Sequence, residues 1–177
     1  MNVKIEEGSP PTRIFYLVES HVCPSNGDGF KLELKDDETF ETDFIGASEQ
    51  DCQKWALEKQ FQANFIEQDI IAIADARSAR DDTLLMQYYA RELDSPEGPL
   101  EFEEFGVLPR EHNTWYDFRI DYKGAATVYV DLTHGPIDTV YPTYFGRKEE
   151  LTDERGAFNV AKARRLVRGE DPNTPQA

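Results

Sequence analysis

The chain has 177 residues, of which 35 are acidic and 19 are basic, so its formal net charge at pH 7 is −16. This length suits one domain with its own core, and an aromatic content of 12% is typical of a folded chain. A surface this acidic repels the phosphates of nucleic acids and anionic lipids, so neither is an expected partner. The charge suits a basic protein, a cation or no partner at all, and solubility alone is the simpler explanation for it.

Cysteine content and the N-terminal sequence bear on location. Cys23 and Cys52 are too few for a disulfide scaffold and have no metal-ligand spacing. The first residues contain no apolar stretch typical of a signal peptide, and no window is apolar enough to span a membrane. We therefore expect a cytoplasmic, reducing location. The composition further predicts a flexible arm over 1–12, a single domain over 13–169 and a flexible tail over 170–177.

The first third of the chain predicts short strands and one helix. The apolar run 13–19 predicts an interior strand, and the alternation over 30–34 predicts another strand that pairs with 39–45. Ser48, followed three residues later by Asp51, resembles a capping box at the start of a helix that extends to about residue 66. Trp55 on this helix is expected in the core rather than at a ligand.

The middle of the chain predicts more strands. The run 69–75 (DIIAIAD) predicts a central strand, 76–82 breaks the pattern, and 83–90 (TLLMQYYA) predicts the next strand. An acidic loop over 94–105 and a short strand over 106–109 follow.

Two C-terminal segments complete the pattern. Residues 140–145 contain Pro142, which predicts an edge segment or an ordered loop. A last helix is expected from the N-cap Asn159 to Arg168, ending at Gly169.

Residues 115–132 predict a single β-hairpin. Apolar and polar residues alternate on both sides of the three-residue loop 123–125, which is the period of two of half-buried strands. The register that keeps apolar side chains on one face places Asp117 opposite Asp131. Facing like charges destabilise a strand pair, so this polar face is the first candidate site.

The chemistry of that face depends on its basic and aromatic residues. Arg119 lies near both carboxylates, so Asp117, Asp131 and Arg119 are the candidate catalytic residues, with one carboxyl of raised pKa acting as a general acid or binding a cation. Trp115 and Tyr129 would form an apolar wall for a ligand. The alternative is that Arg119 neutralises the cluster and the face is only solvated.

Asp75 and Arg77 form a second candidate pair for ligand binding. They follow the expected central strand, where α/β sheets present ligand-contacting groups. A turn begun by Asp75 with Arg77 as its surface partner explains them equally well. His21, His112 and His134 lack the spacing of a zinc site, and no glycine-rich nucleotide loop occurs, so no metal and no cofactor is predicted.

Two passages, IAIADARSARDDTLLMQYY and YFGRKEELTDERGAF, carry a family resemblance. Over about residues 70–169 the chain resembles an uncharacterised family of small domains found in actinobacteria and fungi. In its bacterial members an acidic stretch ends in Gly-Val-Phe, and here the matching residues are 153–158, with alanine in place of valine. The resemblance implies no activity, cofactor or catalytic residue.

The sequence therefore predicts an α+β fold with a mostly antiparallel, or mixed, sheet of six to seven strands and two helices. The first functional hypothesis is a non-catalytic interaction module that binds a basic protein through its acidic surface. The alternative is a small enzyme or ligand-binding domain that uses the carboxylate, arginine and aromatic cluster of the hairpin. A histidine-based metal protein is a third hypothesis.

Overall fold

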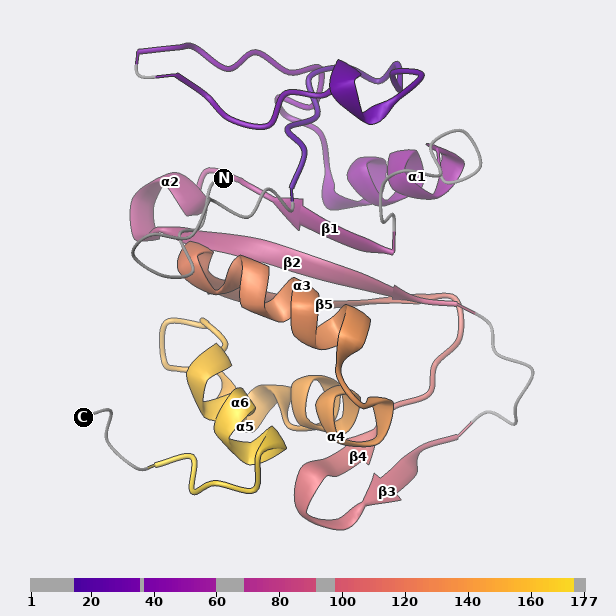
Figure 1. Cartoon of the computed structure of the whole chain (residues 1–177), viewed down its shortest axis with the longest axis vertical. Helices are drawn as coiled ribbons and strands as arrows, with labels where there is room; N and C mark the ends of the chain where they lie inside the picture. Colours follow the sequence, from indigo (N-terminus) through magenta and orange to yellow (C-terminus); the bar gives the residue numbers. More distant parts are fainter. Residues whose placement is uncertain (1–14, 36, 60–68, 92–97, 174–177) are drawn as a thin grey trace. The chain divides into compact units, whose positions relative to one another are not determined.

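The computed structural model describes residues 15–35, 37–59, 69–91 and 98–173. The chain divides into two compact units, Met1–Ile71 and Ala72–Ala177, and each is described by itself (Figure 1). The fold is α+β, and the described part contains five strands in two small antiparallel sheets. This confirms the fold class, whereas the expected sheet of six to seven strands with only two helices is wrong. Within the described part, no helix is both long and apolar enough to cross a membrane.

The first unit contains the helix α1 (Glu49–Lys59). The Ser48 side chain accepts a hydrogen bond from the Asp51 backbone N–H, and Asp51 accepts one from the Ser48 backbone N–H, which confirms the predicted capping box. The predicted continuation of this helix to residue 66 lies outside the described residues.

The strands expected before this helix do not form in the described residues. The strand pairing described between the segments 15–19 and 30–34 is limited to an isolated bridge of Leu17 with Lys31, and 39–45 contains no strand. Residues 13 and 14 lie outside the described part. The segment 39–45 instead contacts 15–19, where the Asp43 backbone N–H donates a hydrogen bond to the Glu19 carbonyl at 2.9 Å and the Thr42 hydroxyl donates one to the Val18 carbonyl.

The larger sheet has the strand order β1-β2-β5, with β1 (Ile70–Ile73), β2 (Thr83–Ala90) and β5 (Thr114–Asp121). β1 and β2 confirm the strands expected at 69–75 and 83–90. The short helix α2 (Ser78–Asp81) occupies the break between them. β5 lies antiparallel to β2, with Met86 opposite Phe118 and Gln87 opposite Asp117.

The predicted hairpin over 115–132 is wrong. Its first half is β5, but its second half is the helix α3 (Ala125–His134). The buried residues of α3 recur at helical spacing: Ala125, Ala126, Val128 and Leu132. This stretch is rich in β-branched residues, yet burial of that stripe outweighs their preference for strands. The turn 122–124 leads from the strand into the helix.

Helices cover one face of this sheet (Figure 1). α3 lies across β2 and β5, and α4 (Ile137–Tyr141), η4 (Pro142–Gly146), α5 (Lys148–Leu151) and α6 (Val160–Val167) follow. The buried Phe118 ring lies 5.9 Å from Tyr144, 6.1 Å from Phe145 and 5.2 Å from Phe158. These rings form the core of the second unit.

Residues 140–145 are helical, because α4 continues directly into η4 at Pro142. The prediction of an edge segment or loop over 140–145 is therefore wrong. The φ of Pro142 is −62°, which is compatible with a helix, and the ring stands at the first position of η4. α6 confirms the last predicted helix: Asn159 is its N-cap and accepts a hydrogen bond from the Lys162 N–H at 3.0 Å.

A second, two-stranded sheet consists of β3 (Leu100–Phe102) and β4 (Gly106–Leu108), joined by the turn η2 (Glu103–Phe105). β4 confirms the short strand expected at 106–109, whereas the predicted acidic loop over 94–105 contains β3. Residues 94–97 of that loop lie outside the described part. The hairpin packs beside α4 and η4 (Figure 1). Gly146 permits this contact, because a Cβ there would lie 1.9 Å from the Val107 carbonyl oxygen.

Candidate functional site

The residues of the first candidate site lie on two different elements. Trp115, Asp117 and Arg119 belong to β5, whereas Tyr129 and Asp131 belong to α3. The predicted pairing of Asp117 with Asp131 is wrong, because β5 takes β2 as its partner instead. The alternative function built on this shared face loses its geometric basis.

The two carboxylates have separate partners. Asp117 forms an ion pair with Lys148 of α5, with 3.3 Å between Oδ1 and Nζ. Asp131 accepts a hydrogen bond from the Tyr144 hydroxyl at 2.7 Å and lies 3.3 Å from Nε of Arg164. Burial raises the pKa of Tyr144, and the neighbouring Asp131 carboxylate raises it further. Asp131 therefore joins α3 to η4 and α6.

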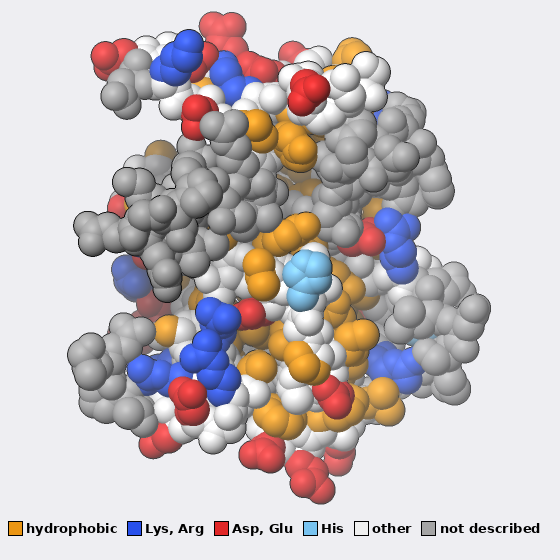
Figure 2. Space-filling view, in the orientation of Figure 1, with side chains coloured by type: hydrophobic (Ala, Val, Ile, Leu, Met, Phe, Trp, Pro, Cys, Tyr) orange, Lys and Arg blue, Asp and Glu red, His pale blue; other side chains and the backbone are white. Residues whose placement is uncertain are grey.

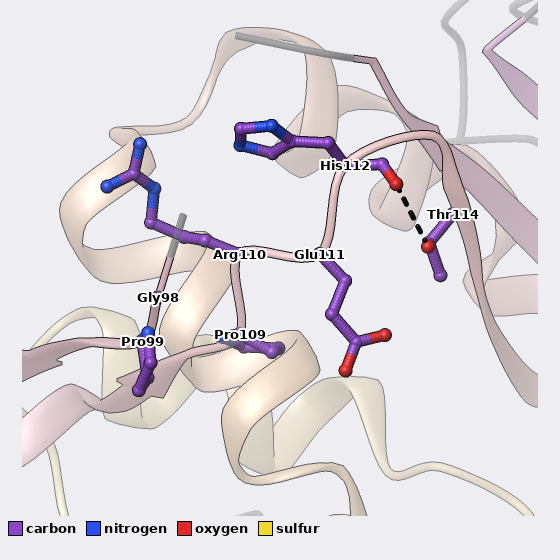
Figure 3. Close-up of a pocket in the computed structure, with 7 residues that line it drawn as sticks. All are labelled: Gly98, Pro99, Pro109, Arg110, Glu111, His112 and Thr114. Carbon is purple, nitrogen blue, oxygen red and sulfur yellow. Dashed lines mark hydrogen bonds between the residues drawn. The ribbon is translucent and has the colours of Figure 1, made fainter. Parts of the chain in front are cut away.

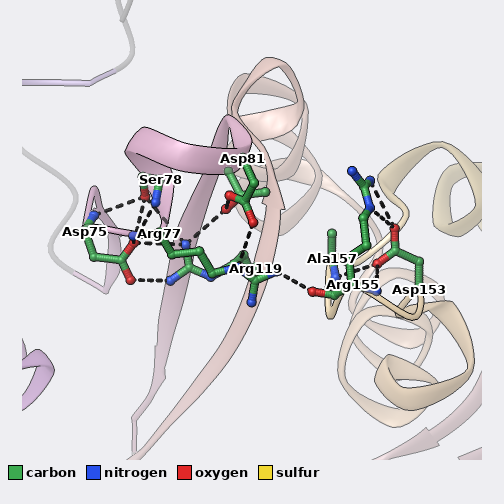
Figure 4. A network of polar contacts seen from close by, with 9 residues as sticks. Asp75, Arg77, Ser78, Asp81, Arg119, Asp153, Arg155 and Ala157 are labelled. Atoms are coloured by element: carbon green, nitrogen blue, oxygen red, sulfur yellow. Dashed lines mark hydrogen bonds and ion pairs between the residues drawn. The ribbon is translucent and has the colours of Figure 1, made fainter.

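Arg119 forms an ion pair with Asp75, which the sequence analysis had placed in the second candidate site together with Arg77. Its two terminal nitrogens contact both carboxylate oxygens of Asp75, and its side chain is only 10% exposed (Figure 4). Although burial raises the pKa of Asp75, hydrogen bonds from Arg119 and Ser78 lower it to about 2. Asp75 is therefore ionised at neutral pH, where it is a poor proton donor.

The turn beside this pair confirms one of the two predicted roles of Asp75. Its Oδ1 accepts hydrogen bonds from the backbone N–H groups of Arg77 and Ser78 at 3.0 and 2.9 Å, so Asp75 begins the turn. Arg77 is not its ion-pair partner, because Nε of Arg77 lies 2.8 Å from Asp81. Arg77 also donates to the carbonyl of Arg155 (Figure 4). These contacts tie the turn to β5 and to the loop before α6.

The aromatic candidate Trp115 packs on its own sheet. Its ring lies 5.1 Å from that of Tyr89, directly opposite on β2. The Tyr89 hydroxyl hydrogen-bonds with Asn113 at 3.0 Å, and the Arg91 guanidinium lies 5.9 Å from the Tyr89 ring. Trp115 and Tyr129 are therefore not neighbours on one hairpin, as the sequence predicted.

An open cavity of about 680 Å³ lies where the chain enters β5. Pro99, Arg110, His112 and Thr114 are among its lining residues (Figure 3). The Arg110 and His112 side chains lie on the same side of the loop, whereas Glu111 between them points away (Figure 3). The sequence reasoning missed this cavity, since His112 was considered only as a zinc ligand.

A second cavity, of about 500 Å³, lies in the first unit beside α1. Trp55 is one of its lining residues and is only partly buried, so the expectation that it belongs to the core is not confirmed. The other lining residues include three carboxylates and two lysines: Asp43, Asp51, Glu58, Lys54 and Lys59. The sequence reasoning missed this arrangement too, although the spacing of the α1 residues on one helical face was a usable signal.

The β3–β4 hairpin presents a mixed apolar and acidic surface. We define the hairpin surface as the strand pair Glu101 and Val107, the turn residues Glu103 and Glu104, and Ile137 with Asp138 at the start of α4. Its side chains are exposed, with Val107 at 41% and Ile137 at 62%. Figure 2 shows carboxylates beside hydrophobic side chains along the lower edge of this unit. α4 lies next to η2, which brings the two parts of the surface together.

Neither a group of metal-binding side chains in the described residues nor a match to a known protein indicates a function for this chain. Among the residues that the structure describes, no three or more His, Cys, Asp or Glu side chains are grouped to hold a metal ion. No family model, curated protein or solved structure matches the chain. The resemblance of residues 70–169 to a family of small domains therefore stays a prediction.

Proposed function

We propose that this protein is a non-catalytic interaction module that binds a basic protein through the hairpin surface. The observation that carries the proposal is the exposure of Val107 and Ile137 among carboxylates on adjoining elements. A net charge of −16 attracts a basic partner over a distance, which raises its rate of association. Burial of the two apolar side chains would then supply affinity that does not depend on salt.

The backbone of Glu103 supports this proposal. Its φ is +37°, in the left-handed region where glycine or asparagine is more stable than glutamate. The turn thus holds the Glu103 carboxylate at a position where glycine or asparagine would make the folded state more stable. Such strain often accompanies a functional side chain.

The test is a titration with a labelled peptide that alternates lysine with leucine, followed by fluorescence anisotropy. The variant Glu101→Gln/Glu103→Gln/Glu104→Gln removes three charges from the hairpin surface and is expected to weaken binding by about tenfold or more. The control Asp28→Asn/Glu41→Gln/Glu154→Gln removes the same charge from exposed positions elsewhere. It is expected to change the dissociation constant by less than about twofold. Equal losses in both variants would show unspecific attraction and overturn the proposal.

A second variant separates apolar contact from charge. Ile137→Ser removes an exposed apolar side chain and leaves the net charge unchanged. We expect it to weaken peptide binding several-fold without altering the salt dependence, since salt acts on the charges. A binding curve identical to that of the unmodified protein would exclude α4 from the interface.

A further inference from the structure

The cavity beside α1 has one wall formed by a single helical face. Asp51, Lys54, Trp55 and Glu58 follow each other at the spacing of residues on one side of a helix, and all four line the cavity. Part of the loop before α1 lines it as well: Asp43, Ile45, Gly46 and Ala47. Its volume of about 500 Å³ suits a single long side chain with its hydration.

The aromatic part of the wall is fixed before any ligand arrives. The indole N–H of Trp55 donates a hydrogen bond to the His21 carbonyl at 2.9 Å. The Phe44 ring lies 5.5 Å from the Trp55 ring and 4.6 Å from the His21 ring, in edge-to-face arrangements. A ring held in this way loses little conformational entropy when a ligand stacks on it.

Two carboxylates of the cavity keep their negative charge well below neutral pH. A hydrogen bond from the His21 backbone N–H lowers the pKa of Asp43, and the Ser20 side chain lowers it further. The Ser48 hydroxyl and backbone N–H lower the pKa of Asp51. The cavity therefore combines fixed negative charge with an aromatic wall.

We propose that this cavity binds an arginine side chain of the basic partner. The inference rests on the proposed function in that it names the side chain by which the partner is recognised. A guanidinium stacks on an indole ring and also donates two parallel hydrogen bonds to a carboxylate, so it uses both parts of the wall. A lysine ammonium is more strongly hydrated and lacks the planar shape.

Lys54 sets the strength of this site. Its Nζ lies 3.7 Å from a carboxylate oxygen of Glu58, and both side chains line the cavity. An incoming guanidinium meets the repulsion of this lysine and competes with it for Glu58. Lys54→Gln is therefore expected to tighten arginine binding several-fold.

The test uses the two tryptophans of the chain as reporters. Trp55 lines the cavity, whereas Trp115 lies on β5, so their indole N–H signals in a ¹⁵N NMR spectrum separate the two places. The probe is acetyl-glycyl-arginyl-glycine amide, and its controls carry citrulline, which is uncharged, or lysine instead. We expect a saturable shift of the Trp55 signal with arginine, a weaker effect with lysine and none with citrulline.

Matched variants show whether the carboxylates take part. Asp43→Asn keeps an oxygen that accepts the His21 N–H but removes the charge, and it is expected to weaken binding about fivefold or more. Asp28→Asn removes an equal charge from an exposed position outside the cavity and is expected to have no effect. An unmoved Trp55 signal, equal shifts with citrulline, or equal losses in both variants would overturn the inference.

The outcome of this experiment on the arginine site can be distinguished from the outcome of the peptide titration on the hairpin surface. If the lysine–leucine peptide still depends on the hairpin surface while the Trp55 signal stays unmoved, only the arginine site fails. If the Trp55 signal responds while both triple variants bind the peptide equally, the hairpin surface fails and the arginine site stands.

Discussion

A bidentate ion pair joins Asp75, at the start of a turn, to Arg119 on β5. The Arg119 side chain is 10% exposed and that of Asp75 is 39% exposed. A guanidinium so poorly hydrated needs its carboxylate, since an unpaired charge in such a place is costly. The contact therefore fixes the turn between β1 and β2 against the third strand.

This ion pair predicts a defined dependence of stability on pH. The pKa of Asp75 is about 2 in the folded protein and 3.8 for a free side chain. Because folding lowers this pKa, the stabilisation is complete above about pH 4 and is lost as the pH falls towards 2. Asp75→Asn should lower the free energy of unfolding at pH 7 by about 1 kcal/mol, a value reduced for the partial exposure of the pair.

Urea melts at pH 7 and below pH 4 measure this effect. The difference between Asp75→Asn and the unmodified protein should shrink as the pH approaches 2. Glu154→Gln, at an exposed position in the same unit, serves as the control and should differ little at any pH. A deficit of Asp75→Asn that stays constant across this range would contradict the low pKa.

Asp131 gives a second prediction. Had it faced Asp117, removal of its charge would have stabilised the protein. The contacts with Tyr144 and Arg164 predict the opposite, so Asp131→Asn should lower the free energy of unfolding by about 1–3 kcal/mol.

A double-mutant cycle tests the contact with Tyr144 directly. The losses from Asp131→Ala and Tyr144→Phe should be smaller together than the sum of the single losses, because each variant removes the same hydrogen bond. Strict additivity in urea melts would show that the hydroxyl and the carboxylate do not interact.

At the scale of elements, local signals predicted some segments and failed for others. The Ser48–Asp51 capping box and the N-cap Asn159 marked α1 and α6, because a cap involves only neighbouring residues. The apolar run of β2 was equally clear. α3 was missed because its alternation fits a strand, and only burial against the sheet and neighbouring helices makes a helix the better solution.

The predicted pairing of Asp117 with Asp131 was wrong for the same reason. Asp117, Asp131 and Arg119 each form an ion pair, but which residue becomes the partner depends on which strands pair. Asp75 and Arg119 are 44 positions apart in sequence, and no local pattern links them. Only the pairing of β2 with β5 and the turn after β1 bring them together.

The contact of β4 with η4 gives a prediction for an element interface. A Cβ at position 146 would lie 1.9 Å from the Val107 carbonyl oxygen. The backbone of β4 would have to move away to relieve this clash, which would disturb its contact with η4. Gly146→Ala should destabilise the protein by about 3 kcal/mol or more and release the hairpin from η4.

Thermal melts monitored by circular dichroism measure this change. Gly124→Ala is the matched control, since a Cβ there would lie 3.2 Å from a methyl group of Val160, which has more freedom to move. Similar melting temperatures for Gly146→Ala and the control would contradict the close backbone contact.

At the scale of the whole molecule, the net charge of −16 sets the response to salt. Like charges repel more strongly in the compact state than in the extended chain, so screening should favour the folded form. Raising sodium chloride from low concentration to about 1 M should increase the melting temperature by several degrees. A fall would mean that screened ion pairs outweigh the repulsion.

The pairing of β2 with β5 also sets an order of events during folding. The 23 residues from Arg91 to Asn113 separate the two strands, and closing a flexible loop of this length costs about 3 kcal/mol of chain entropy. β3 and β4 lie inside this loop and are joined by a three-residue turn, so they meet faster than the long strands do. Once β3 and β4 have paired, less unfolded chain has to close between β2 and β5. The β3–β4 hairpin, which we propose binds a partner, is therefore also expected to form early in folding. Its early formation would speed the pairing of β2 with β5 in the larger sheet.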